Sequence, residues 1–134
     1  MIHTNDIFKH EFSFSQNDIV KFAEVTGDKN PVHLNAEYAA TTMFKVPIMH
    51  GMLGASLFSK VFGTLFPGEG TIYLKQSLSF LKPMYVDTIY EAVFKVKEVN
   101  VEKHRAIIET LIHEKSTGAI CTNGEATVMN VNKI

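Results

Sequence analysis

The spacing of apolar residues changes along this chain, and each change predicts a different kind of element. Residues 8–14 alternate Phe or His with polar side chains, which is the period-two pattern of a strand with one buried face. Ser15 then precedes Asp18 by three positions, the spacing of a capping box. Apolar residues follow at helical intervals, so we expect a short helix that runs to Thr26 and stops at Gly27.

A proline controls the next stretch. Asn30 precedes Pro31, and the residue before a proline avoids helical backbone angles. Residues 28–33 are therefore predicted to form a loop. Asn35 is a suitable N-cap, so a second short helix is expected over residues 35–42.

The longest apolar stretch, residues 51–66, is hydrophobic around most of a helical wheel and must be covered on nearly all sides. The pattern then changes to long strands, which are expected at residues 73–81, 88–99, 103–114 and 119–131. Repeats and linkers are absent, so residues 1–134 are predicted to be a single domain. We expect an α+β fold in which an antiparallel sheet wraps a long central helix.

Composition narrows the function. The chain has 134 residues, 46% of them hydrophobic and 20% charged, which is too apolar for a disordered protein. The net charge of −1 lacks the basic footprint of a nucleic-acid-binding protein. One cysteine, Cys121, forms no intrachain disulfide, and the N-terminus does not read as a secretory signal, so a cytoplasmic setting is expected. Residues 47–67 contain Lys60 and several polar side chains, so no membrane segment is expected.

The densest polar cluster is residues 26–33, in which Asp28 and His33 stand five positions apart around the Asn30-Pro31 turn. A carboxylate and an imidazole at one spot can move protons onto and off a substrate or a water molecule. A purely structural role is the alternative: Asp28 would cap the turn, and His33 would be a surface residue or one with its hydrogen bonds satisfied.

A second cluster, residues 47–52, leads into the predicted central helix. Backbone N–H groups at a helix N-terminus can hold a developing oxyanion, and Gly51 would let a carbonyl group approach closely. Gly51 could instead serve only close helix packing. Ser56 and Ser59 lie in the same helix, where a hydroxyl either bonds back to the preceding turn or reaches a ligand.

The sequence lacks the motifs of metal binding, serine hydrolysis and phosphate binding. The six histidines show no paired metal-ligand spacing, so no metal is expected. A Gly-x-Ser-x-Gly elbow and glycine-rich phosphate loops are absent from the sequence. Cys121 sits in an apolar strand, where a buried inert thiol is expected.

Together these segments resemble the MaoC-like (R)-specific enoyl-CoA hydratases, a family that includes enzymes supplying monomer for polyhydroxyalkanoate synthesis. The resemblance runs from Phe14 to about Met129. Its most specific part is residues 26–33 followed by Ala39, which match the family motif Gly-Asp-x-Asn-Pro-x-His and a small residue six positions on. Further stretches agree in order and spacing: residues 39–42, 47–52, 55–59 and 73–80.

Two positions depart from the family pattern. Phe22 stands where the family often has tyrosine, and the glycine that usually precedes the strand-opening aspartate is missing at residues 86–88. Neither position belongs to the motif, so the implied reaction is unchanged, while the inference about acyl length is weakened.

The resemblance implies a hotdog fold and a homodimer whose sheets join edge to edge. It also implies reversible addition of water to a trans-2-enoyl thioester, giving the (R)-3-hydroxyacyl thioester. Asp28 and His33 would carry the proton transfers and the Gly51 N–H would bind the thioester oxygen. Asn30 and Ser59 would be further substrate-binding residues. No cofactor is expected, because the CoA thioester is the substrate.

Three alternatives remain open from sequence: a hotdog acyl-CoA thioesterase, a 3-hydroxyacyl dehydratase acting on acyl carrier protein, and a non-catalytic acyl-binding module. The division of acid and base roles between Asp28 and His33, the acyl length and the pathway are also open.

Overall fold

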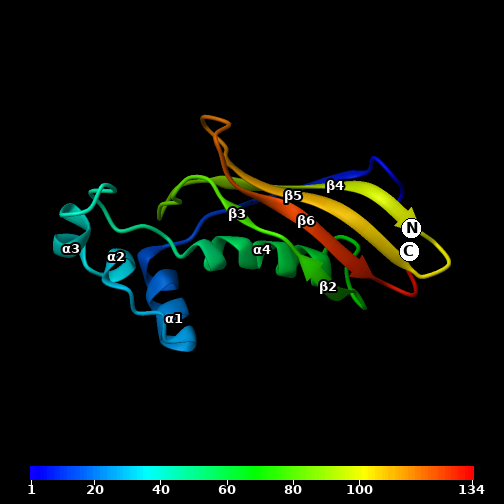
Figure 1. Cartoon of the computed structure of the whole chain (residues 1–134), viewed down its shortest axis with the longest axis horizontal. Helices are drawn as coiled ribbons and strands as arrows, with labels where there is room; N and C mark the ends of the chain where they lie inside the picture. Colours follow the sequence, from blue (N-terminus) through cyan, green and yellow to red (C-terminus); the bar gives the residue numbers. More distant parts are fainter.

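One antiparallel sheet and one long helix organise the molecule (Figure 1). The computed structural model describes all 134 residues. The strands follow the order β1-β4-β5-β6-β2, and β3 also pairs with β6. Their bounds are β1 (Ile7–Phe12), β2 (Ile72–Gln76), β3 (Ser79–Phe80), β4 (Tyr90–Asn100), β5 (Arg105–Glu114) and β6 (Ile120–Met129). The helices are α1 (Gln16–Thr26), α2 (Pro31–Leu34), α3 (Ala36–Ala40) and α4 (Gly51–Thr64).

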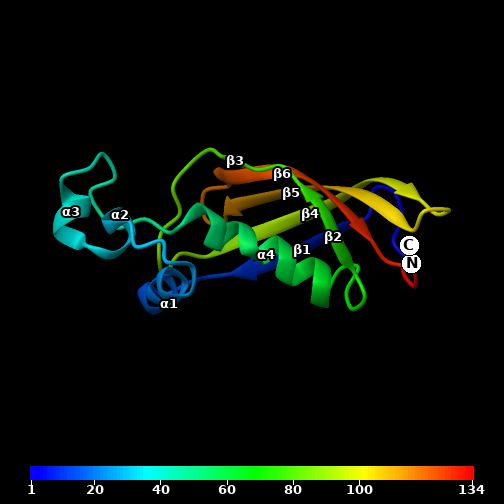
Figure 2. The same ribbon diagram turned by 60° about the horizontal axis from the view of Figure 1, so that its bottom comes forward.

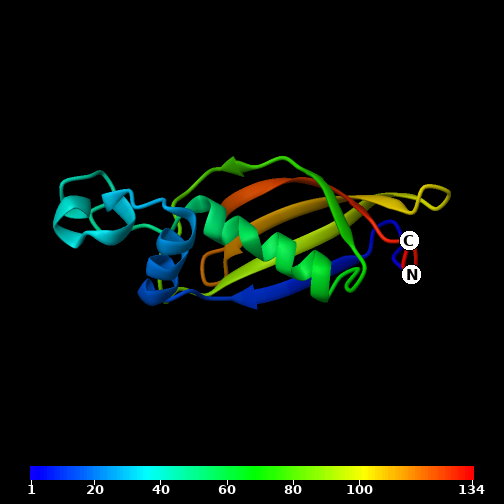
Figure 3. The same ribbon diagram turned by 90° about the horizontal axis from the view of Figure 1, so that it is seen from below.

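Helix α4 runs lengthwise along one face of the curved sheet (Figures 2 and 3). Phe58 and Phe62 on this helix are almost wholly buried, with ring centroids 5.7 and 5.2 Å from that of Phe94 on β4. Burying such a side chain contributes roughly 1.5–3 kcal/mol, so this layer of aromatic rings is a major part of the core. The expected α+β hotdog arrangement, a sheet wrapped around a central helix, is confirmed.

The first strand follows its sequence pattern. Burial alternates residue by residue through β1, and Phe8 pairs with Phe94 in an antiparallel register with β4. The strand ends at Phe12, two residues before the end of the alternating pattern, although the Phe14 ring still packs against the core. The capping box at Ser15 is present, and Gly27 ends α1 with a left-handed φ of 78°.

The predicted strand over residues 73–81 is wrong, because the chain breaks there into β2 and β3. Both segments pair with β6, but between them Ser77 lies directly against Gly124. An ideal Cβ on Gly124 would lie 1.8 Å from the Ser77 carbonyl oxygen, a separation that no side chain can occupy. The Ser77 N–H still donates to Glu125 O at 2.9 Å, so the chain stays close to β6 through the break, and glycine allows this close approach.

Three local predictions also need correction. Residues 28–33 are not entirely loop, since α2 begins at Pro31, where a proline fits the first helical turn. The helix expected over residues 35–42 is shorter and ends at Ala40, although Asn35 is its N-cap as predicted. Helix α4 ends at Thr64 rather than at residue 66.

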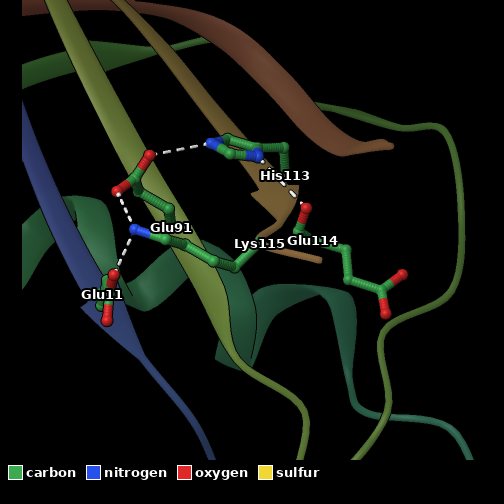
Figure 4. A network of polar contacts seen from close by, with 5 residues as sticks. All are labelled: Glu11, Glu91, His113, Glu114 and Lys115. Carbon is green, nitrogen blue, oxygen red and sulfur yellow. Dashed lines mark hydrogen bonds and ion pairs between the residues drawn. The ribbon is translucent and has the colours of Figure 1, made fainter. Parts of the chain in front are cut away.

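A polar network joins β1, β4 and β5 away from the central helix (Figure 4). Glu91 is buried, and its carboxylate lies 3.0 Å from His113 Nε2 and 3.3 Å from Lys115 Nζ. Lys115 also pairs with Glu11. Burial raises the pKa of Glu91, but the hydrogen bonds from His113 and Lys115 outweigh it and hold that pKa below its usual value. The network is a structural link between strands.

The structure also bears on the predictions for the single cysteine and for membrane segments. Cys121 is buried and free, and burial raises the pKa of its thiol, as expected for an inert cysteine. Among the helices of the chain, none combines the length and the apolar character that crossing a membrane would need.

Candidate active site

A cavity of about 490 Å³ opens where α2, the start of α4 and the segment after β3 meet. Polar groups from two distant parts of the sequence face it, within walls that are largely apolar. The residues that line it include Asp28, His33, His50, Gly51 and Phe80. A mainly apolar cavity with a few convergent polar groups is typical of a small-molecule site.

His33 is held in one orientation by the backbone. It lies on α2, is 9% exposed, and its Nδ1 is 2.8 Å from the carbonyl oxygen of Ile48. A carbonyl only accepts, so Nδ1 carries the hydrogen and Nε2 is left with a free lone pair. Burial lowers the pKa of His33, partly opposed by the Ile48 hydrogen bond. His33 is therefore suited to accept a proton near neutral pH.

The His33 imidazole should titrate below the ordinary histidine value of about 6.5. Burial disfavours its charged form, so the neutral form should persist to lower pH than in an exposed histidine. The measurement is an NMR titration of the imidazole C–H signals, assigned with His33→Gln. A midpoint at or above the ordinary value would contradict the assigned environment.

Asp28 follows the left-handed Gly27 and has an exposed side chain. Its N–H donates to Thr26 Oγ1 at 3.1 Å, and its Oδ1 accepts weakly from Asn30 N–H at 3.4 Å. The turn-capping role is thus present, but Oδ2 has no partner in the chain. One side-chain ligand atom each of Asp28, His33 and His50 lies within 4.8 Å of the others. The structure therefore brings Asp28 and His33 together at the cavity.

Gly51 begins helix α4 and lines the same cavity. At this helix start Leu53 and Gly54 donate to the His50 carbonyl, at 3.0 and 3.3 Å, while the Gly51 N–H has no acceptor in the chain. This free donor is available to an oxyanion. Packing also favours glycine, because an ideal Cβ would lie 2.7 Å from the Phe80 ring.

Asn30 and Ser59 do not join this cluster. The Asn30 side chain caps α2 by accepting from Val32 N–H at 3.2 Å, and it does not line the cavity. Ser59 lines a second cavity of about 440 Å³ between α4 and β2, and Met52 borders both cavities. Ser56 bonds back to Leu53 O at 2.5 Å, the structural alternative expected for a helical serine.

His50 is the residue that the sequence reasoning missed. It is 2% exposed, and its Nε2 is 3.0 Å from the Asp28 carbonyl oxygen. Its ring packs against those of His33 and Phe22, with centroids 3.8 and 4.8 Å apart. The signal in the sequence was a polar residue, His50, directly before the apolar stretch that forms α4. Only the fold shows that its side chain reaches the loop that contains Asp28.

The same three side chains are the ones that could hold a metal ion. The two imidazole rings are tilted by 30°, with centroids 3.8 Å apart. His33 Nδ1 and His50 Nε2 are each bonded to a backbone carbonyl oxygen, so one nitrogen of each ring stays available. A histidine nitrogen with a free lone pair beside a carboxylate can also transfer protons.

Comparison with known proteins identifies relatives of this chain. The family described as "MaoC like domain" matches residues 2–119. An (R)-specific enoyl-CoA hydratase of Aeromonas caviae is 44% identical over 115 residues, which cover 86% of this chain and 85% of that protein. The Rhodospirillum rubrum enzyme of the same name is 41% identical over 117 residues, covering 87% of this chain and 80% of that protein.

The three-dimensional structure leads to the same group. The solved (R)-hydratase of A. caviae, described as involved in PHA biosynthesis, superposes with a TM-score of 0.91 at 39% identity. The match covers 96% of this chain and 97% of the A. caviae chain. Sequence match, relatives and fold agree, and the chain belongs to the MaoC-like domain family.

Proposed function

We propose that this protein is an (R)-specific enoyl-CoA hydratase, a hydro-lyase that adds water reversibly to trans-2-enoyl-CoA. The product is the (R)-3-hydroxyacyl-CoA. The observation that carries the proposal is the meeting of three groups at one cavity: the Asp28 carboxylate, the His33 imidazole and the free Gly51 N–H. Relatives at 41–44% identity carry the same enzyme name.

The reaction needs three things from the protein. As the water oxygen bonds to C3, a proton leaves the water; C2 gains a proton; negative charge builds on the thioester oxygen in between. Asp28 and His33 hold the water and exchange these protons, so the pair ends each cycle in its starting state. The Gly51 N–H donates to the thioester oxygen while it carries the charge. Dehydration is the same path reversed.

We propose that the reaction uses no metal or organic cofactor, because proton transfer and one oxyanion donor account for every bond change. The thioester can be presented by CoA or by an acyl carrier protein, and CoA is the form named in the two relatives at 41–44% identity. A reducing compartment such as the cytoplasm suits the free Cys121 thiol.

The purified protein should hydrate crotonyl-CoA to the (R) alcohol without added metal. Loss of the conjugated double bond is followed by absorbance, and the product is resolved by chiral chromatography. Treatment with a chelator should leave the rate unchanged. Predominantly (S) product, release of free CoA thiol, or a rate lost to the chelator and restored by metal would each refute the assignment.

We also propose a homodimer. Strand β2 is at the end of the sheet order, and its apolar residues Ile72 and Leu74 are exposed. An exposed apolar edge strand is a liability that a second copy removes by continuing the sheet. Light scattering should give a mass near twice 15.0 kDa. A fully active monomer at the assay concentration would refute the dimer.

A further inference from the structure

The reaction centre is built from two segments, residues 28–33 and residues 48–51. A side chain of each segment bonds to the backbone of the other. The His33 side chain reaches the backbone of the second segment, with Nδ1 2.8 Å from Ile48 O. The His50 side chain reaches back to the first segment, with Nε2 3.0 Å from Asp28 O. A backbone bond from Ile48 N to Val32 O, at 3.2 Å, lies between them.

His50 connects Asp28, of the acid/base pair, to the oxyanion donor Gly51 N–H. It directly precedes Gly51 in the chain, and it bonds directly to the backbone of Asp28. Asp28 is otherwise fixed only by contacts within its own turn, to Thr26 and Asn30. The bond from His50 is thus the hydrogen bond that ties Asp28 to the α4 side of the cavity.

The His50 ring has little freedom to move. It is nearly fully buried between Phe22 and His33, and as N-cap of α4 its side chain makes no capping hydrogen bond. Its Nδ1 has no partner. A buried histidine with an unsatisfied nitrogen is costly to keep, because an apolar ring would fill the same space without that cost. The hydrogen bond that the His50 side chain does make is from Nε2 to the Asp28 carbonyl oxygen.

We propose that His50 is a positioning residue, which holds Asp28 at a fixed distance from the Gly51 N–H through its Nε2–H bond to the Asp28 carbonyl. The inference rests on the proposed hydratase function. Reacting groups displaced by about 1 Å can lose roughly 100-fold in rate, even when the substrate still binds. Loss of this bond should therefore lower kcat more than it changes KM.

Two substitutions separate the hydrogen bond from the packing. His50→Phe keeps a planar ring between Phe22 and His33 but removes the donor. His50→Gln gives up the ring and keeps an amide N–H that extends about as far as Nε2. With crotonyl-CoA, His50→Phe should lower kcat roughly 10- to 100-fold with KM within about 3-fold of wild type, and His50→Gln should recover most of that loss. The pH profile of His50→Gln should match that of wild type.

His104→Phe is the matched control. The His104 side chain, like that of His50, bonds to a backbone carbonyl, with its Nδ1 2.7 Å from Ile134 O, but it does not line the cavity. Its substitution removes the same kind of contact elsewhere, so kcat should stay at the wild-type value even if the melting temperature falls. His50→Asn, whose shorter amide falls short of Asp28, takes the place of His50→Phe if the latter does not fold, with the same loss expected.

The outcomes are distinguishable. If the wild type is active and His50→Phe is equally active, the positioning role is wrong while the proposed function stands. The same conclusion follows if His50→Asn has the wild-type rate. A folded His50→Gln that is as slow as His50→Phe, or one whose pH profile has shifted, would also overturn the positioning role, since His50 would then act through its ring or transfer a proton itself. An inactive wild type would overturn the proposed function, and this inference with it.

Discussion

Replacing either Asp28 or His33 should slow hydration of crotonyl-CoA by about 10²- to 10⁴-fold, which corresponds to a barrier higher by roughly 3–5 kcal/mol. Asp28→Asn and His33→Gln keep approximate size and polarity while removing the proton chemistry. The Asp28 side chain is exposed, so its substitution should leave the melting temperature nearly unchanged. His33→Gln should cost more stability, because the Ile48 contact and a buried ring are both altered.

The double variant tests whether the two groups act as one unit. If Asp28 and His33 serve the same water and the same protons, the second substitution has little left to remove after the first. The double variant should then be only slightly slower than the slower single variant. Steady-state kcat/KM on folded protein is the measurement. Deficits that multiply would indicate independent roles, as for uncoupled sites, and a near-normal single variant would remove that residue from the mechanism.

Local pattern was enough to predict the central elements of the fold. The apolar stretch at residues 51–66 has too few polar positions for a surface helix, and it is α4, buried against the sheet. Alternation in β1 and the capping box at Ser15 depend only on near neighbours in sequence, and both are present. The break between β2 and β3 was missed because it occurs where Ser77 approaches Gly124, which lies 47 positions later in the sequence.

The positions of the site residues could also be predicted only where the residues lie close together in sequence. Asp28 and His33 lie in one short motif, so a turn suffices to bring them together. The position of Ser59 could not be predicted, because it depends on which face of α4 is turned toward β2, where Ser59 lines the second cavity. His50 was missed because its contact to Asp28 spans 22 residues and depends on how two segments pack. The catalytic roles themselves stay predictions.

Gly51→Pro should lower kcat by about 10²- to 10³-fold relative to Gly51→Ala, the loss typical of removing one oxyanion donor. Both variants add a Cβ that must displace the Phe80 ring, so this steric effect is shared between them. Only proline lacks the N–H. The backbone accepts it, because Gly51 is the first residue of α4 and His50 has a ψ of 128°, within the range preferred before proline.

A third variant and a control complete the test of Gly51. Gly51→Val keeps the N–H but adds more bulk at Phe80 and at the thioester oxygen, so it should lose most activity while remaining folded. Gly63→Ala changes a glycine of the same helix with nothing within 4 Å of the new Cβ, so activity should be unchanged and stability slightly increased. Circular dichroism confirms folding of each variant. If Gly51→Pro were as active as Gly51→Ala, the oxyanion would have to be held by another donor, of which the Met52 N–H is the nearest along the helix.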